Sequence, residues 1–175
     1  MPAVEPFGHF DHCPRCGARA DGASAQDRFR CGRCGFVLFF NAACAVAAFV
    51  TREDGRVLFI TRAKEPARGR LAVPGGFVDV GETAENALRR EIREEVGLDL
   101  ASVEYLTSHP NQYPYAGVLY STLDLFFRAA PVDPASARAL DGIEGLRWLD
   151  PETVDPADLA FESMRDALAV YRARR

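Results

Sequence analysis

The chain has 175 residues, of which 48% are hydrophobic, and it carries a formal net charge of −4 with a pI near 5.4. This length allows one full domain with its own core and a small additional module. The acidic balance argues against a surface built to bind nucleic-acid phosphates, and no stretch approaches transmembrane length. No targeting segment, repeat or low-complexity tract is found, so we expect a cytoplasmic protein without membrane contact.

Two Cys-x2-Cys pairs stand near the start of the chain, Cys13 with Cys16 and Cys31 with Cys34. Thiolates at this spacing favour tetrahedral Zn²⁺. The alternative, two disulfides, is disfavoured because no signal peptide precedes the pairs. All four ligand positions are cysteines, so the predicted site is closed and structural, and zinc supplies folding energy to a segment too short for its own core. We therefore predict a zinc ribbon over residues 1–40.

Zinc ribbons often bind nucleic acid, so the charge of this segment matters. Five arginines are nearly balanced by four acidic residues within residues 1–40, whereas a phosphate-binding surface shows a basic excess. Phe29 and Phe36 fit the packing of a small ribbon better than the stacking of bases. The expected partner is a small-molecule nucleotide and not nucleic acid.

Two strands and a loop follow the ribbon. The apolar run Asn41–Thr51 predicts a buried strand in which Cys44 is a small core residue. Asp54-Gly55 predicts a turn, and Arg56–Arg62 a second strand. Ala63–Arg70 reads as a polar loop.

A glycine turn and a helix come next, in the stretch GFVDVGETAENALRREIREEVGL of residues 76–98. Thr83–Val96 contains no proline or glycine and predicts a helix that ends at Gly97. Glu91 and Glu95 continue the apolar stripe of this helix, with Glu94 alongside. Carboxylates crowded on a half-buried face repel one another unless a hard cation such as Mg²⁺ or Mn²⁺ neutralises them. The alternative, an acidic surface helix with arginine partners, leaves the spacing and the glycines unexplained.

The spacing G-x5-E-x7-R-E-U-x-E-E-x-G-U, with U a bulky aliphatic residue, resembles the Nudix box. The resemblance implies an α/β fold, the Nudix α/β/α sandwich with a mixed sheet, over residues 41–175. It also implies a hydrolase of nucleoside diphosphate-linked substrates. The metal ligands it implies are the Gly75 carbonyl, Glu91, Glu94 and Glu95, and the structural positions are Gly76, Glu82 and Arg90, with Glu82 and Arg90 as an ion pair.

The remaining elements complete this fold. We predict strands at Val103–Ser108, Leu119–Ala129 and Leu146–Leu149, with a proline-rich loop after the first. Leu159–Arg174 predicts a second helix, whose apolar side includes Leu159, Met164, Leu168 and Tyr171.

The combination of ribbon and box resembles the zinc-ribbon NADH pyrophosphatases, which carry S-Q-P-W-P-F-P-x-S beyond the box. Here residues 108–115 read SHPNQYPY. Ser108, Pro110, Tyr113 and Pro114 match, whereas His109, Asn111 and Gln112 differ, with Asn111 at the position of the tryptophan. The resemblance favours NADH, NAD or ADP-ribose as substrates.

Candidate substrate-binding residues surround these motifs. Tyr113 and Tyr115 offer flat faces for a purine, and His109 offers a hydrogen-bond donor. Arg62 and Arg70 bracket the loop before the box and suit a diphosphate. For the tyrosines the alternative is packing on the domain or on a dimer partner, and for the arginines it is a solvated role.

The reaction that the resemblance implies is metal-assisted hydrolysis, which needs a general base. Glu94 and Glu95 are candidates in the box, and Glu144 is the candidate outside it. Two other classes remain open: a nucleotide sensor without turnover, and an RNA-processing or decapping enzyme that docks through its ribbon. The intact carboxylates argue against the first and the weak basic balance against the second. Ribbon-bearing relatives are commonly dimers, so the resemblance implies a homodimer.

Overall fold

A computed structural model describes residues 4–20 and 27–174, apart from the side chain of Phe7. The chain forms two compact units. The smaller comprises Met1–Ala43 and Gln112–Ser121, and the larger comprises Cys44–Asn111 and Thr122–Arg175. The smaller unit therefore includes a piece of chain far from the ribbon in sequence. The predicted division at residue 40 stays a prediction.

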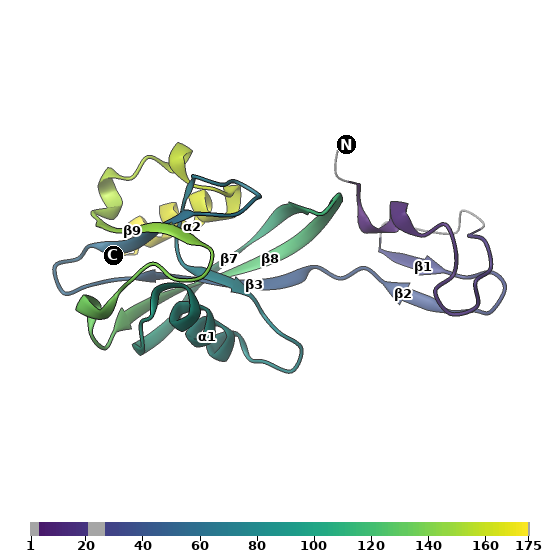
Figure 1. The fold of residues 1–175 in the computed structure, drawn as a ribbon, viewed down its shortest axis with the longest axis horizontal. Helices are drawn as coiled ribbons and strands as arrows, with labels where there is room; N and C mark the ends of the chain where they lie inside the picture. Colours follow the sequence, from purple (N-terminus) through teal and green to yellow (C-terminus); the bar gives the residue numbers. More distant parts are fainter. Residues whose placement is uncertain (1–3, 21–26, 175) are drawn as a thin grey trace. The chain divides into compact units, whose positions relative to one another are not determined.

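Strands β3 to β9 form two sheets that belong mainly to the larger unit (Figure 1). One sheet has the order β6-β3-β8-β7, and the other has the order β5-β4-β9. The bounds are β3 Ala43–Val50, β4 Val57–Arg62, β5 Leu71–Ala72, β6 Gly75–Phe77, β7 Leu100–Tyr115, β8 Val118–Pro131 and β9 Ile143–Leu149. β3 pairs antiparallel with β6, while β3 and β8 run in the same direction (Figure 1). The sheet is therefore mixed, as predicted.

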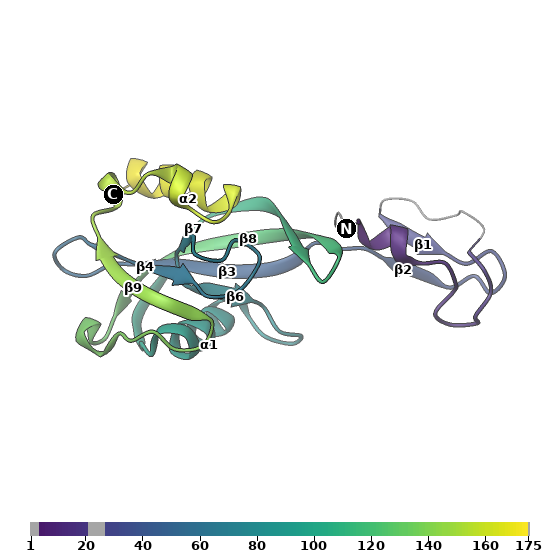
Figure 2. The same ribbon diagram turned by 45° about the horizontal axis from the view of Figure 1, so that its top comes forward.

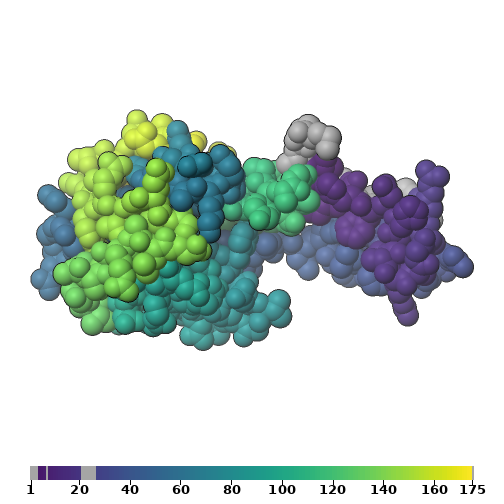
Figure 3. Space-filling model, in the orientation of Figure 1, coloured from purple at the N-terminus to yellow at the C-terminus, as the bar shows by residue number. Residues whose placement is uncertain are grey.

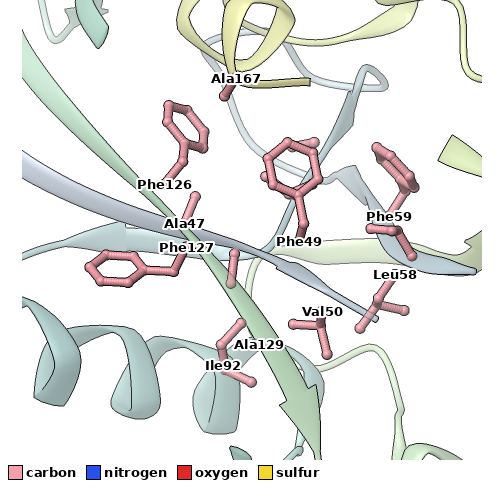
Figure 4. Packing of buried hydrophobic residues seen from close by; sticks show 14 of the residues in the cluster. Ala47, Phe49, Val50, Leu58, Phe59, Ile92, Phe126, Phe127, Ala129 and Ala167 are labelled. Atoms are coloured by element: carbon pink, nitrogen blue, oxygen red, sulfur yellow. The ribbon is translucent and has the colours of Figure 1, made fainter. Parts of the chain in front are cut away.

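Two helices cover opposite sides of the four-stranded sheet, α1 (Ala84–Val96) on one and α2 (Glu162–Ala173) on the other (Figure 2). Phe126 points from the sheet toward Ala167 of α2, whereas Phe127 lies on the side of Ile92 in α1 (Figure 4). Apolar residues on both faces are thus buried, which gives three layers and confirms the predicted α/β fold. Within the part of the chain that is described, neither helix is long or apolar enough to cross a membrane.

The box helix forms as its sequence predicts. The Thr83 side chain accepts a hydrogen bond from the Asn86 N–H at 3.2 Å, and Gly97 ends the helix in a left-handed conformation. Its buried residues are Ala87, Leu88, Ile92 and Val96. The second helix starts three residues later than predicted because Leu159 makes a parallel bridge to Leu71, which keeps the chain extended.

The prediction of a proline-rich loop after Ser108 is wrong, because strand β7 continues to Tyr115. Ala116 and Gly117 both have positive φ, 49° and 82°, as in the two-residue turns that join long antiparallel strands. Alanine is an uncommon residue at the first of these positions, so the sequence gives no clear turn signal. The Gln112 amide donates to the Ser121 hydroxyl across the hairpin at 3.3 Å.

Cys44 lies in a strand as predicted, but its side chain is exposed, so its assignment to the core is wrong. The continuously buried part of β3 begins only at Val46. Cys44 precedes the region in which both faces of the strand are covered.

The smaller unit contains a short antiparallel pair, β1 (Arg28–Arg30) and β2 (Val37–Phe39), and the 3-10 turn η1 (Pro6–His9). Its buried residues are Cys13, Phe29 and Cys31, with Phe10 among the apolar side chains packed on them. The remaining 3-10 turns, η2 (Pro134–Ser136), η3 (Pro151–Thr153) and η4 (Pro156–Asp158), belong to the larger unit.

Candidate active site and zinc site

Two glycines of β6 bring the box carboxylates against the backbone. The Gly75 N–H donates to Glu95 Oε2 at 2.9 Å. A Cβ on Gly76 would lie 2.5–2.6 Å from the carboxylate atoms of Glu91, so only glycine allows this approach. Gly75 is constrained as well, because a Cβ there would lie 2.0 Å from the Val46 carbonyl. Glu91 and Glu95 therefore meet at one dipeptide, whose linking carbonyl belongs to Gly75.

Burial sets the charge state of these carboxylates. It raises the pKa of Glu95 to about 8, because the loss of hydration outweighs the Gly75 hydrogen bond and the positive charge of Arg62. The negative charges of Glu91 and Asp141 act in the same direction as burial. The pKa of Glu91 is also raised, again chiefly by burial. A bound cation would stabilise the ionised forms of these two carboxylates.

Arg90 organises the acidic residues around it. It forms an ion pair with Glu82 at 2.9 Å, as predicted, and it also donates to the Phe77 carbonyl at 3.0 Å. These bonds fix the loop before α1 against the helix, and they lower the pKa of Glu82. The same guanidinium donates to Glu91 at 2.7 Å and to Glu94 at 3.3 Å.

The donor set suits a hard divalent cation. Glu91 and Glu95 are half-buried and both lie against the Gly75–Gly76 backbone. Carboxylate and carbonyl oxygens are the ligands that Mg²⁺ and Mn²⁺ prefer. Glu94 is more exposed and points to Arg90. The oxygen atoms of the box carboxylates lie farther apart than the cysteine sulfurs. Within the described residues, only the four cysteines have ligand atoms that all lie within 4.8 Å of one another.

The two candidate arginines make protein contacts. Arg62 Nε donates to the Pro66 carbonyl at 2.9 Å and its guanidinium lies 5.0 Å from the Phe161 ring. Arg70 donates to the carbonyls of Ala157 and Leu159. Only Arg62 has a charge that influences Glu95. Arg70 instead ties the loop to the segment before α2.

Glu144 is exposed on β9, between Ile143 and Gly145, which pair with Arg62 and Thr61 of β4. Asp141, three residues earlier, forms an ion pair with Lys64 at 3.1 Å. On the surface of the larger unit the loop 63–70 lies beside the segment entering β9 (Figure 3). The influence of Asp141 on Glu95 was missed because nothing in the local sequence marks it.

The structure does not bring all the substrate-binding candidates to the box helix. His109 lies on the α2 side of the sheet, where Nδ1 is 3.8 Å from Asp166 and the ring is 6.3 Å from that of Phe126. Tyr113 and Tyr115 belong to the smaller unit, with ring centroids 6.3 Å apart.

The four cysteines have the geometry of a zinc site. Sγ atoms of Cys13 and Cys34 lie 3.7 Å apart, as do those of Cys16 and Cys31. Sulfurs bound to one Zn²⁺ at about 2.3 Å in a tetrahedron lie about 3.8 Å apart. All four are free thiols, so the disulfide alternative does not apply. The Cys34 backbone N–H lowers the pKa of the Cys31 thiol to about 7, which favours its thiolate. Despite the Phe36 N–H, burial and the neighbouring thiols raise the pKa of the Cys34 thiol to about 11, so the pair shares its protons unequally without a metal.

This fold and this site define a family. The NUDIX domain model matches residues 42–171, and the chain belongs to that family. The prediction that this chain belongs to the Nudix family is therefore confirmed. A crystal structure of a NUDIX hydrolase from Nitrosomonas europaea is similar over 94% of this chain and 92% of that one, with a TM-score of 0.70 and 24% identity, which supports the fold.

Two curated relatives are similar in sequence. The NAD-capped RNA hydrolase NudC of Pseudomonas aeruginosa (strain LESB58) is 28% identical over 167 residues, which are 95% of this chain and 57% of that protein. The ADP-ribose pyrophosphatase of Methanocaldococcus jannaschii is 39% identical over 84 residues, which are 47% of this chain and 49% of that protein. The chain thus spans little more than half the length of the first relative.

Proposed function

We propose that this protein hydrolyses the diphosphate of a small nucleoside diphosphate-linked molecule, with Mg²⁺ or Mn²⁺ as cofactor. NADH, NAD and ADP-ribose are the favoured substrates. The observation that carries the proposal is the convergence of Glu91 and Glu95 on the Gly75-Gly76 backbone. The names of the two relatives support the substrate class, because NAD and ADP-ribose each contain a diphosphate between two ribose units.

The proposed roles follow from charge and position. Glu91, Glu95 and the Gly75 carbonyl hold the cation, with Glu94 as a further carboxylate at the exposed end. A bound cation neutralises the diphosphate and lowers the pKa of an attacking water. Arg90 holds Glu82, Glu91 and Glu94 in place. Glu95 and Glu94 remain candidates for the general base, and Glu144 is the candidate outside the helix.

The base-binding role of Tyr113 and Tyr115 remains part of the proposal. Tyr115 is 59% exposed, which suits a ring that stacks on a ligand or on a second copy of the chain. A homodimer and a cytoplasmic location are likewise proposed. The free cysteines support a reducing compartment.

A second candidate function is the removal of an NAD cap from RNA. The name of the Pseudomonas relative favours it, and the expectation that this chain binds no nucleic acid is untested. The outer face of the ribbon pair carries Arg28 and Arg30 beside the exposed Phe39. Asp27 neutralises Arg28 at 2.7 Å, so we rank RNA after the free dinucleotides.

A substrate panel tests the proposal. NADH, NAD, ADP-ribose, FAD, nucleoside triphosphates and NAD-capped RNA are compared with Mg²⁺ and with Mn²⁺. We expect two monophosphate products from the dinucleotides and from ADP-ribose. Preference for capped RNA over free NAD would support the second candidate. Tight nucleotide binding without turnover would indicate a sensor.

A further inference from the structure

The N-terminal end of the ribbon holds the tip of the β7–β8 hairpin. The Val4 N–H donates to the Gly117 carbonyl at 3.0 Å, and the Leu119 N–H donates to the Val4 carbonyl at 2.9 Å. The two bonds form a parallel bridge between Val4 and Val118. Val4 therefore adds a one-residue bridge to the edge of the tip, and Gln112–Ser121 forms one compact unit with the ribbon.

A short path of contacts joins Val4 to the cysteines. His9 Nε2 donates to the Val4 carbonyl at 3.3 Å across the turn η1. The next residue, Phe10, places its ring 5.5 Å from Phe29 and 5.4 Å from Phe40. Phe29 is fully buried and packs with the cysteines. The position of Val4 thus depends on the order of the cysteine core.

This core is too small to fold without a metal. Among the described residues of this core, three are buried, and two of them, Cys13 and Cys31, are themselves ligand candidates. Segments of this size obtain their folding energy from the ligation of thiolates. A two-stranded hairpin is also only marginally stable in water. Loss of the zinc site is therefore expected to release Val4 and leave the tip with two strands.

We propose that the cysteine ribbon, acting through Val4, positions the hairpin tip that carries Tyr113 and Tyr115. Val4 is a positioning residue that touches no substrate. The inference rests on the proposed function in one respect, namely that the tyrosines bind the nucleotide base. The ribbon then contributes to substrate affinity and is more than a stabilising module.

Hydrogen exchange measured by mass spectrometry tests whether the ribbon stabilises the hairpin tip. Val4→Pro removes the N–H that binds Gly117, whereas the control Val4→Ala keeps both backbone hydrogen bonds. Cys31→Ser opens the zinc site. We expect peptides from residues 112–121 to exchange about ten-fold faster in Val4→Pro and Cys31→Ser. Peptides from β4 should be unchanged in every variant.

The zinc content of the Val4→Pro variant shows whether faster exchange comes from the lost Val4 contact or from unfolding of the ribbon. One zinc per chain in this variant, together with faster exchange in the tip, supports the role of Val4. If exchange in the tip stays at the wild-type rate in both Val4→Pro and Cys31→Ser, the positioning role is overturned.

Kinetics with ADP-ribose and Mg²⁺ test whether the effect passes through the tyrosines. Val4→Pro should raise KM and change kcat by less than about two-fold. In a Tyr113→Ala background the same change should have no further effect, since both act on one contact. Fully additive effects would overturn the proposed route through Tyr113. If the wild type cleaves neither ADP-ribose nor a dinucleotide, the proposed function fails, while hydrogen exchange still decides whether Val4 holds the tip.

Discussion

At the scale of single residues, Glu95 is the most informative side chain. It is half-buried, it accepts from the Gly75 N–H, and burial raises its pKa to about 8. A purely structural acid at this position gains little from ionisation. A cation ligand gains the full interaction with the metal, which offsets the loss of hydration.

The first prediction replaces this carboxylate with its amide. Glu95→Gln should lower turnover at least about a hundred-fold. The fold should survive, because the amide oxygen can still accept from Gly75. Rates are measured against Mg²⁺ concentration, with circular dichroism as the check on folding. Near-normal turnover at low Mg²⁺ would show that Glu95 is no metal ligand.

The second prediction concerns stability and pH. The pKa of Glu95 rises from its ordinary value of 4.5 to about 8 on folding, so the folded protein keeps a proton that the unfolded chain releases. Without metal, the free energy of unfolding should therefore fall as the pH rises from 4.5 to 8. This group contributes at most about 1.4 kcal/mol per pH unit to that fall. The raised pKa of Glu91 acts in the same direction.

Thermal unfolding in EDTA from pH 5 to 8.5 measures this dependence. Glu95→Gln should flatten it, and Mn²⁺ should raise the Tm of the wild type more at pH 8 than at pH 6. Equal slopes in wild type and variant would contradict the assignment of the proton to Glu95.

At the scale of elements, the glycine turn and the box helix act as one unit. The third prediction is that Gly76→Ala displaces the Glu91 carboxylate, because the added Cβ would lie 2.5 Å from Glu91 Cδ. Because the atoms that the Cβ meets are the flexible end of a side chain, the cost falls on activity, about ten-fold or more in kcat/KM. Gly145→Ala is the matched control, since its Cβ meets nothing within 4 Å. Equal behaviour of the two variants would mean that close approach at Gly76 is unimportant.

The elements also show what the sequence can and cannot predict. The box helix was predictable because its cap, its stop residue and its carboxylate spacing are all local signals. The long hairpin was not, because a turn with Ala116 in place of asparagine gives no such signal. The exposure of Cys44 and the placement of His109 against α2 depend on which faces of the strands are covered. Tertiary contacts determine which faces are covered, and the alternation of residues along one strand does not show them.

At the scale of the whole molecule, the two proposed metal sites differ in chemistry, and each belongs to a different compact unit. The fourth prediction is one tightly bound Zn²⁺ per chain, held by Cys13, Cys16, Cys31 and Cys34. Elemental analysis of the purified protein checks the ratio. Removal of zinc should lower thermal stability and leave the requirement for Mg²⁺ or Mn²⁺ unchanged. Protein that contains no zinc after purification under reducing conditions would refute the assignment.

The proposed reaction is the cleavage of a diphosphate between two nucleoside or ribose groups. The most direct measurement is the initial rate and product identity with ADP-ribose, NADH and nucleoside triphosphates in Mg²⁺, resolved by chromatography, for wild type and Glu95→Gln. We predict AMP with ribose 5-phosphate from the first, AMP with reduced nicotinamide mononucleotide from the second, and loss of both activities in the variant. Triphosphates hydrolysed much faster than either ADP-ribose or NADH, or products retaining the diphosphate, would contradict the proposed reaction.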